Sequence, residues 1–334
     1  IAKNSGVKIN KQYNLLISDF LEFDGNPQGF RILTKLHTEQ DEFSLNLTYA
    51  TLLCALKYSR AAGEEKGQGI LNKAGYFQSE KETVEKLYNY VGIKLHRRYP
   101  LTYIMEAADD IAYCLSDISD GIEKRIITIE DFIYEFEKTW QEKYDNAHCP
   151  VQVPNHIINF SLSISVPWSK QAINEAADNY ISNHIDIMNG QAAQLIPEDG
   201  IGRVFETIKH VSRKVLYKSI EAESIELTGY AVMTGMLKHF QRLLELSKDE
   251  FKRLLNNEDV KNLDLERRLF NRLGKRYVKA YIYAVNKINN EDENFASIEW
   301  WLRTHLIIDH VSGMTDEFAL ETYQMLEGIS LLKL

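Results

Sequence analysis

The feature that most constrains the fold is a helical periodicity of apolar residues with few helix breakers in it. Proline occurs only six times in 334 residues, and the most regular stretch is residues 101–121. Pro100 before this stretch and Gly121 at its end are typical helix punctuation. Apolar side chains recur at three- and four-residue steps and predict one buried helix face. That face comprises Ile104, Ala108, Ile111, Ala112, Leu115 and Ile118. We therefore expect an all-α protein.

One carboxylate of this expected helix, Asp109, is a candidate for binding a cation. Asp109 lies at the edge of the apolar face, and Tyr113 and Asp117 follow one and two turns later on the same line of the helix. A carboxylate at the rim of a buried face costs free energy unless a cation, for example a metal ion, pairs with it. The alternative is a solvated acidic face made of Glu106, Asp109 and Asp110. The spacing leaves both interpretations open.

Net charge and cysteine content exclude or disfavour several classes of protein. The formal net charge of −9 disfavours non-specific nucleic-acid binding. One basic face remains, which is either solvated or directed at a nucleotide or DNA, and it comprises Lys209, Arg213, Lys214 and Lys218. The three cysteines have no CxxC spacing and predict neither disulfides nor a zinc site. We expect a cytoplasmic protein without a membrane span, since no apolar run approaches about 18 residues.

The segment from Ala147 to Pro154 is the best candidate for a domain boundary. It contains two of the six prolines and few periodic apolar residues. We accordingly expect two regions, 1–147 and 148–334.

The central helix carries a resemblance to a known family. Residues 105–114, Met-Glu-Ala-Ala-Asp-Asp-Ile-Ala-Tyr-Cys, resemble the last aspartate motif of the bacterial HD-domain dGTP triphosphohydrolases (dGTPases). Several further phrases resemble the same family and follow in the family's order, and they cover residues 22–31, 46–60, 73–77, 95–101, 225–230 and 307–316. The first of them, 22–31, departs from the family pattern at Asp24 and Pro27. The resemblance implies an HD-domain-like helical bundle with additional C-terminal helices, in which the 307–316 segment is a structural helix.

The resemblance also implies roles for individual residues. It makes Asp109 the last of four ligands of a divalent metal, Mg²⁺ or Mn²⁺ or another transition metal. It places Tyr113 on the deoxyribose and lets Asp117 accept a hydrogen bond from the 3′-OH. Further implied substrate contacts are Lys57, Tyr58 and Lys73 on the phosphate side, Glu226 near the base and Arg268 from a subunit interface. Each has a simpler interpretation: Lys57 and Arg60 would close a helix after an N-cap at Thr48, and Lys73 would be solvated.

The implied reaction is metal-dependent hydrolysis of dGTP to deoxyguanosine and inorganic triphosphate. The implied assembly is a homo-oligomer, a hexamer, with single-stranded DNA as a further partner. The alternatives are a broader dNTP triphosphohydrolase and a non-catalytic helical protein for oligomerisation or nucleic-acid binding. The chain has no His-Asp dipeptide, so we expect it to correspond to the C-terminal two-thirds of such an enzyme. The catalytic residues and the other metal ligands would then precede Ile1.

Overall fold

The structure is a computed structural model of the 334-residue chain. It describes every residue except 1–6, 8, 38–43, 146, 154–156, 158, 259–260, 290–291 and 330–334. The chain forms two compact units. Unit 1 combines Ile1–Leu52, Tyr58–Leu87 and Thr228–Leu334, and unit 2 combines Leu53–Lys57 and Tyr88–Leu227. The expected boundary near residue 147 falls inside unit 2, and a functional division at that point stays a prediction.

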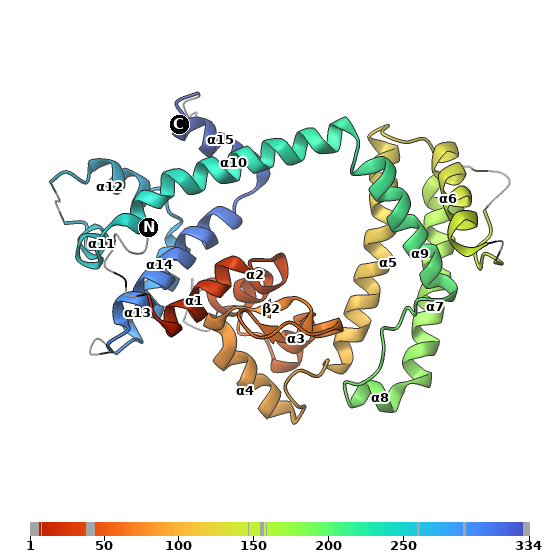
Figure 1. Ribbon diagram of the computed structural model, residues 1–334, viewed down its shortest axis with the longest axis horizontal. Helices are drawn as coiled ribbons and strands as arrows, with labels where there is room; N and C mark the ends of the chain where they lie inside the picture. Colours follow the sequence, from red (N-terminus) through yellow and green to blue (C-terminus); the bar gives the residue numbers. More distant parts are fainter. Residues whose placement is uncertain are drawn as a thin grey trace. The chain divides into compact units, whose positions relative to one another are not determined.

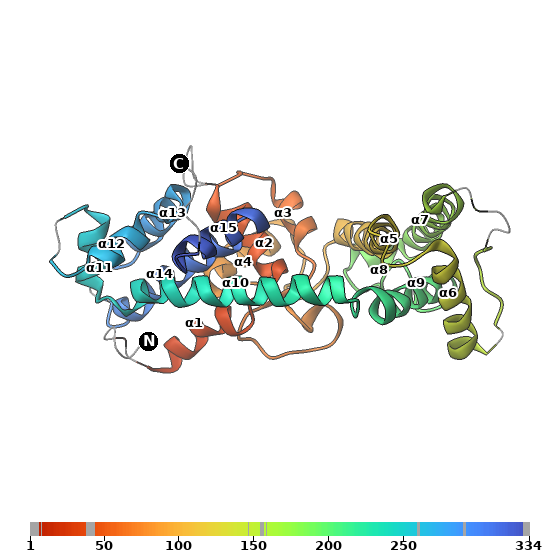
Figure 2. The same ribbon diagram turned by 90° about the horizontal axis from the view of Figure 1, so that it is seen from above.

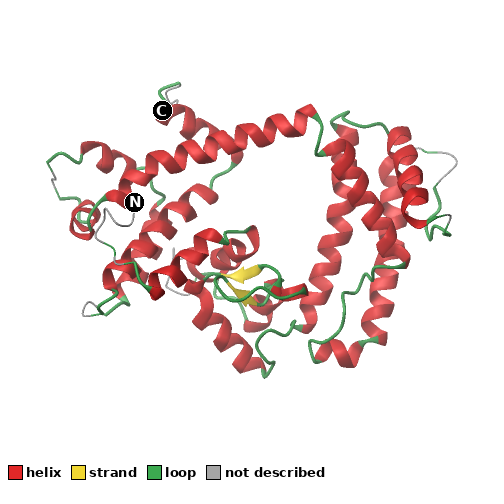
Figure 3. Ribbon diagram, in the orientation of Figure 1, coloured by secondary structure: helices red, strands yellow, loops and turns green. Residues whose placement is uncertain are grey.

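The expectation of an all-α protein is confirmed, since helices dominate the described residues (Figures 1 and 3). Helices α3 (Tyr49–Ala55), α4 (Lys81–Val91) and α10 (Ile220–Glu245) each run from one unit into the other. The other α-helices of unit 1 are α1 (Lys11–Leu21), α2 (Gly25–Arg31), α11 (Lys248–Leu255), α12 (Asp264–Phe270), α13 (Lys275–Asn286), α14 (Phe295–Ser312) and α15 (Asp316–Leu326). Those of unit 2 are α5 (Pro100–Glu123), α6 (Ile129–Tyr144), α7 (Val166–Ser182), α8 (His184–Met188) and α9 (Gly200–Val211).

Unit 1 also contains one small parallel strand pair, which the apolar periodicity did not predict. Strand β1 (Arg60–Ala61) pairs with β2 (Ala74–Tyr76), as Figure 3 shows in yellow. A side chain on Gly75 is excluded there, because a Cβ atom would lie 1.7 Å from the carbonyl oxygen of Tyr58. Short π- or 3₁₀-helical turns complete the fold at Ile32–Leu36, Gly69–Leu71, Gln78–Glu80, Ser161–Ser165 and Ser212–Leu216.

Helix α14 forms the centre of unit 1. It packs against α1, α11 and α13 (Figure 1). Most of its side chains are buried. Because α14 is buried on every side, Trp300, Leu302 and Leu306 all enter the core, and the polar side chains of this helix are buried with them. The expectation that 307–316 contributes a structural helix is thus confirmed for residues up to Ser312.

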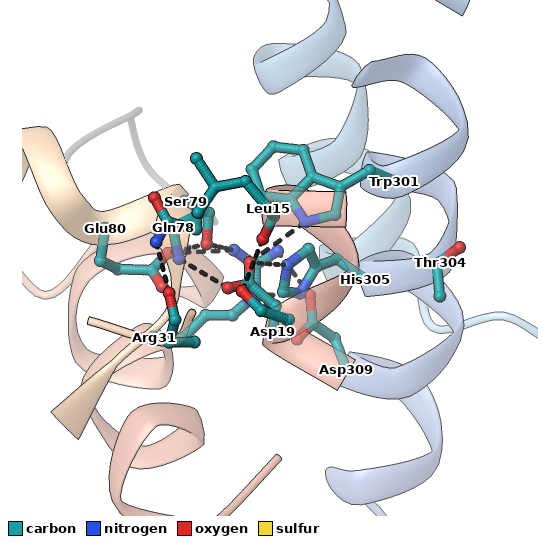
Figure 4. A network of polar contacts seen from close by, with 12 residues as sticks. Leu15, Asp19, Arg31, Gln78, Ser79, Glu80, Trp301, Thr304, His305 and Asp309 are labelled. Atoms are coloured by element: carbon teal, nitrogen blue, oxygen red, sulfur yellow. Dashed lines mark hydrogen bonds and ion pairs between the residues drawn. The ribbon is translucent and has the colours of Figure 1, made fainter. Parts of the chain in front are cut away.

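A buried polar network connects two of the sequence phrases across unit 1 (Figure 4). The guanidinium of Arg31 donates to both carboxylate oxygens of Asp309, at 2.8–3.1 Å, and its Nη1 lies 3.1 Å from Glu80 Oε1. The side-chain amide of Gln28 also donates to Asp309 at 3.1 Å. A buried charge needs such partners, so the 22–31 and 307–316 phrases have a structural reason to occur together.

The core of unit 2 lies around α5, which packs against α7 and α9. Pro100 occupies the first turn of α5, as its position in the sequence predicted. The helix does not end at Gly121 but continues to Glu123. Gly121 instead allows close packing, since a Cβ atom there would lie 2.5 Å from Leu216 Cδ2.

The buried face of α5 differs from the expected one. Ile111, Leu115 and Ile118 are buried as predicted. Ile104, Ala108 and Ala112 are exposed, and Tyr103, Ala107 and Cys114 are buried instead. The buried stripe is therefore rotated along the first half of the helix, which places Asp109 on the exposed side.

Candidate functional site

Asp109 forms an ion pair with Lys57 within unit 2. Lys57 Nζ lies 3.0 Å from Asp109 Oδ2, and the two side chains are 18% and 57% exposed, respectively. Burial alone would lower the pKa of Lys57, but the hydrogen bond and charge of Asp109 outweigh it, with help from Asp110 and Glu106, and the pKa is raised. The partner of the Asp109 carboxylate in this structure is therefore a lysine ammonium.

The backbone before Lys57 is held against the start of α5. Thr102 Oγ1 donates to the carbonyl oxygen of Leu53 at 2.9 Å. The prediction that Lys57 and Arg60 close a helix is wrong, because α3 ends at Ala55. Arg60 begins β1 instead, is 1% exposed, and forms an ion pair with Glu22. The predicted N-cap is correct, since Thr48 Oγ1 accepts from Thr51 N at 3.2 Å.

Tyr113 and Asp117 are joined by a residue that sequence reasoning missed. Tyr217 Oη donates a hydrogen bond to Asp117 Oδ2 and is also hydrogen-bonded to Tyr113. Burial raises the pKa of the Tyr217 phenol, and the two hydrogen bonds raise it further. The phenol thus stays protonated and can act as a donor. Its only sequence signal was its place at the end of the basic amphipathic segment.

The basic face is largely neutralised by carboxylates of unit 2. Lys209 lies 3.4 Å from Asp110, and Lys214 Nζ lies 2.5 Å from Glu135. Arg213 lies 3.6 Å from Glu206. Of the two interpretations of this face, the structure favours paired surface charges over a surface for polyanions.

A polar cavity of about 450 Å³ lies beside α5 in unit 2. One of its lining residues, Asp110, directly follows Asp109 in the sequence. Asp110, Tyr144, Gln194, Glu206 and Lys209 are among its lining residues. Its walls can donate and accept hydrogen bonds, and its volume is in the range of small-molecule pockets.

The other predicted contacts lie elsewhere along the chain. Tyr58 is half-buried, and Lys73 is exposed with its Nζ 3.3 Å from Asp24 Oδ2, both in unit 1. Glu226 is exposed on α10, and Arg268 is exposed on α12 beside a shallow pocket. Within unit 2, the structure therefore pairs Lys57 with Asp109 on the helix that also carries Tyr113 and Asp117.

The described residues do not by themselves form a metal centre. Among them, no three His, Cys, Asp or Glu side chains are grouped so that they could hold a metal ion. Asp109 offers one carboxylate, whereas protein sites for divalent cations use several ligands. In the described part of the chain, no helix is long and apolar enough to cross a membrane.

Comparison with known proteins shows which proteins the chain is similar to. No family model matches the chain. The chain is similar to bacterial hydrolases of nucleoside triphosphates in an alignment of 331 positions, which covers 93% of its length. Relatives from Enterobacter sp. (strain 638) and Klebsiella pneumoniae are 32% identical, and one from Salmonella paratyphi A is 31% identical. All three are deoxyguanosinetriphosphate triphosphohydrolases, and the chain spans 64% of the length of each. The chain is related to this family, as the motifs suggested.

Proposed function

We propose that the protein hydrolyses dGTP to deoxyguanosine and inorganic triphosphate. The observation that carries the proposal is the similarity of 93% of the chain to three proteins with that named activity. In this reaction water attacks the α-phosphorus, the bond from phosphorus to the 5′-oxygen breaks, and the 5′-oxygen leaves as the hydroxyl of deoxyguanosine. Because the chain spans 64% of the length of these relatives, the activity of the whole protein is part of the proposal.

Lys57 is the proposed phosphate contact. Its ammonium is partly buried, 3.0 Å from Asp109, and retains 18% exposure. A triphosphate oxygen could take one of its three N–H donors while Asp109 keeps another. Asp109 would thus hold the Lys57 ammonium in place before the substrate arrives. The lysine side chain then loses less conformational freedom when the triphosphate binds.

Tyr113 and Asp117 are the proposed sugar contacts, and Tyr217 is the residue that positions them. Tyr217 occupies one oxygen of Asp117, so the other oxygen is available to accept from a 3′-OH. Tyr113 is 58% exposed and could pack on the deoxyribose. Its hydrogen bond to Tyr217 would fix the ring where a 2′-OH would collide with it.

Tyr58, Lys73, Glu226 and Arg268 remain proposed substrate contacts. Lys73 has the clearest basis, because an exposed ammonium paired with Asp24 can exchange that partner for a phosphate. By resemblance Glu226 lies near the base. A substrate panel of dNTPs would show which bases the protein accepts and would also test the broader dNTP alternative.

We also propose a divalent metal, Mg²⁺ or Mn²⁺, with Asp109 as one of its ligands. Since the described residues do not form a metal centre, the other ligands would come from sequence outside them. A bound metal would supply charge neutralisation for the triphosphate.

The proposed assembly is a homo-oligomer, a hexamer, in the cytoplasm, and light scattering would test its size. Single-stranded DNA has less support, since Lys209, Arg213 and Lys214 are paired with carboxylates. Binding of a labelled oligonucleotide at low and moderate salt would test that partner.

The proposal is tested by measuring the intact mass of the purified natural protein and then assaying it. Chromatography would detect deoxyguanosine and tripolyphosphate from dGTP, with dATP, dCTP, dTTP and GTP compared. Asp109→Ala should abolish hydrolysis, and Asp120→Ala, an exposed carboxylate on the same helix, should not. Hydrolysis unaffected by Asp109→Ala would refute the role of Asp109. If the purified protein is as long as its relatives and hydrolyses no dNTP, the proposed activity is refuted.

A further inference from the structure

Unit 1 contains a cavity that the proposed function does not use. It has a volume of about 340 Å³ and is formed by α11, α13 and the start of α14, whose places Figures 1 and 2 show. Leu255, Val285, Ile288 and Phe295 supply apolar wall surface. The remaining lining residues are mostly polar, and the volume lies in the range of small-molecule sites.

Two lysines give the cavity a positive rim. Lys248 and Lys252 lie one turn apart on α11, and both line the cavity with exposed side chains. Lys248 Nζ lies 4.6 Å from the centre of the Phe295 ring, so the ammonium is directed towards the apolar wall. Neither lysine belongs to any ion pair within the described part of the chain.

The carboxylate on the cavity lining does not cancel this charge. Glu299 accepts from Tyr281 Oη at 2.6 Å and from Arg303 Nε and Nη2 at 3.0 and 2.5 Å. Glu299 and Arg303 are 2% and 1% exposed. The charges of Glu299 and Arg303 cancel each other in this buried pair, so the two rim lysines leave the cavity entrance with a net positive charge. An anion entering the cavity would therefore meet attraction at the rim.

We propose that this cavity binds a small organic anion, a carboxylate or a phosphate monoester that carries an apolar body. The anionic group lies between Lys248 and Lys252, and the body contacts Val285, Ile288 and Phe295. Burial of the body supplies free energy in proportion to its apolar area, and the two ammonium groups select the sign of the charge. A neutral molecule of the same shape gains only the first contribution.

Titration of the whole protein with matched probes tests the proposal, using calorimetry together with saturation-transfer NMR. Octanoate, 1-octanol and octyltrimethylammonium share an apolar body and differ in charge. We expect saturable binding of octanoate, about tenfold tighter than that of octanol or the cation and weaker at high salt. A comparison with phenyl phosphate tells a carboxylate site from a phosphate site. Absence of saturable binding by both anions, or equal affinity for octanoate and octanol, would overturn the proposal.

Variants locate the binding. The double variant Lys248→Gln with Lys252→Gln should weaken octanoate binding by about tenfold and leave octanol unchanged. Lys238→Gln with Lys275→Gln changes the net charge equally on exposed lysines of the same unit, and it should have no effect. Unit 2 has an apolar groove that includes Ile173. Binding that survives in the Lys248/Lys252 variant but is lost in Ile173→Gln would place the probe in that groove and refute the proposed site.

Discussion

Replacing Asp19 by asparagine should change how the stability of the protein depends on pH. Asp19 is fully buried in the network of Figure 4, where it accepts from Gln78 N at 2.7 Å and from Trp301 Nε1 at 3.1 Å. Its other neighbour is His305, with Nε2 at 3.0 Å. Burial raises the pKa of Asp19 from 3.8 to about 8, and burial lowers the pKa of His305 well below its usual value. At neutral pH a protonated Asp19 therefore donates to a neutral His305.

The pH dependence follows from this proton. The unfolded chain releases it near pH 3.8 and the folded chain only near pH 8. Asp19 thus contributes stability that is fully present below the lower value and is lost as the pH rises to the upper one. At about 1.4 kcal/mol per unit, the four units between them correspond to a loss on the order of 5 kcal/mol.

Asp19→Asn lacks this titration. Near pH 5 we expect the variant to be less stable by about 1–3 kcal/mol, because its amide N–H would face the indole N–H of Trp301. From there to about pH 8 the free energy of unfolding of the variant should fall less steeply than that of the parent, by about 1.4 kcal/mol per unit, so the difference shrinks and then changes sign. Urea unfolding at several pH values measures both slopes. Glu317→Gln, an exposed control, should follow the parent, and parallel slopes for parent and Asp19→Asn would refute the assigned proton.

Three further substitutions test the site and the fold. Lys57→Met should lower kcat/KM for dGTP by roughly 10- to 100-fold, because a charged hydrogen-bond donor is lost, and unchanged steady-state kinetics would contradict its phosphate role. Tyr217→Phe should raise KM for dGTP by about fivefold and reduce discrimination against GTP, whereas an unchanged ratio of the two substrates would remove its positioning role. Gly75→Ala should destabilise the protein by about 2 kcal/mol or more, since the new methyl group meets the Tyr58 carbonyl. A thermal midpoint equal to that of the parent would show that the backbone of the strand pair moves apart at little cost and would contradict this prediction.

The helix that carries Asp109 was predictable, but its surroundings were not. Periodicity and Pro100 located α5, because both act within one segment. Gly121 was misassigned because glycine suits a helix end and a close contact equally well, and only the packing of Leu216 distinguishes them. Ile104 and Ala108 follow the apolar period yet are exposed, since periodicity identifies an apolar face but not what covers it.

The partners of the site residues come from distant segments. Lys57 precedes Asp109 by 52 residues, and Tyr217 follows Asp117 by 100. No local pattern indicates such contacts, although the resemblance did single out Lys57. Strands β1 and β2 were missed for a different reason, because two or three residues are too few to show an alternating pattern.

The connection between Arg31 and Asp309 has a consequence for synthesis of the chain. The two residues are 278 positions apart, so at about 5–20 residues per second the ribosome would need roughly 15–60 s to supply the second after the first. Most of unit 2, from Tyr88 to Leu227, is complete before Thr228–Leu334 has been made. The nascent N-terminal segments must therefore wait without Asp309 while the middle of the chain folds, and until then Arg31 has only its earlier partners, such as Glu80. A stalled or shortened C-terminus would leave those early segments as a target for chaperones and proteases.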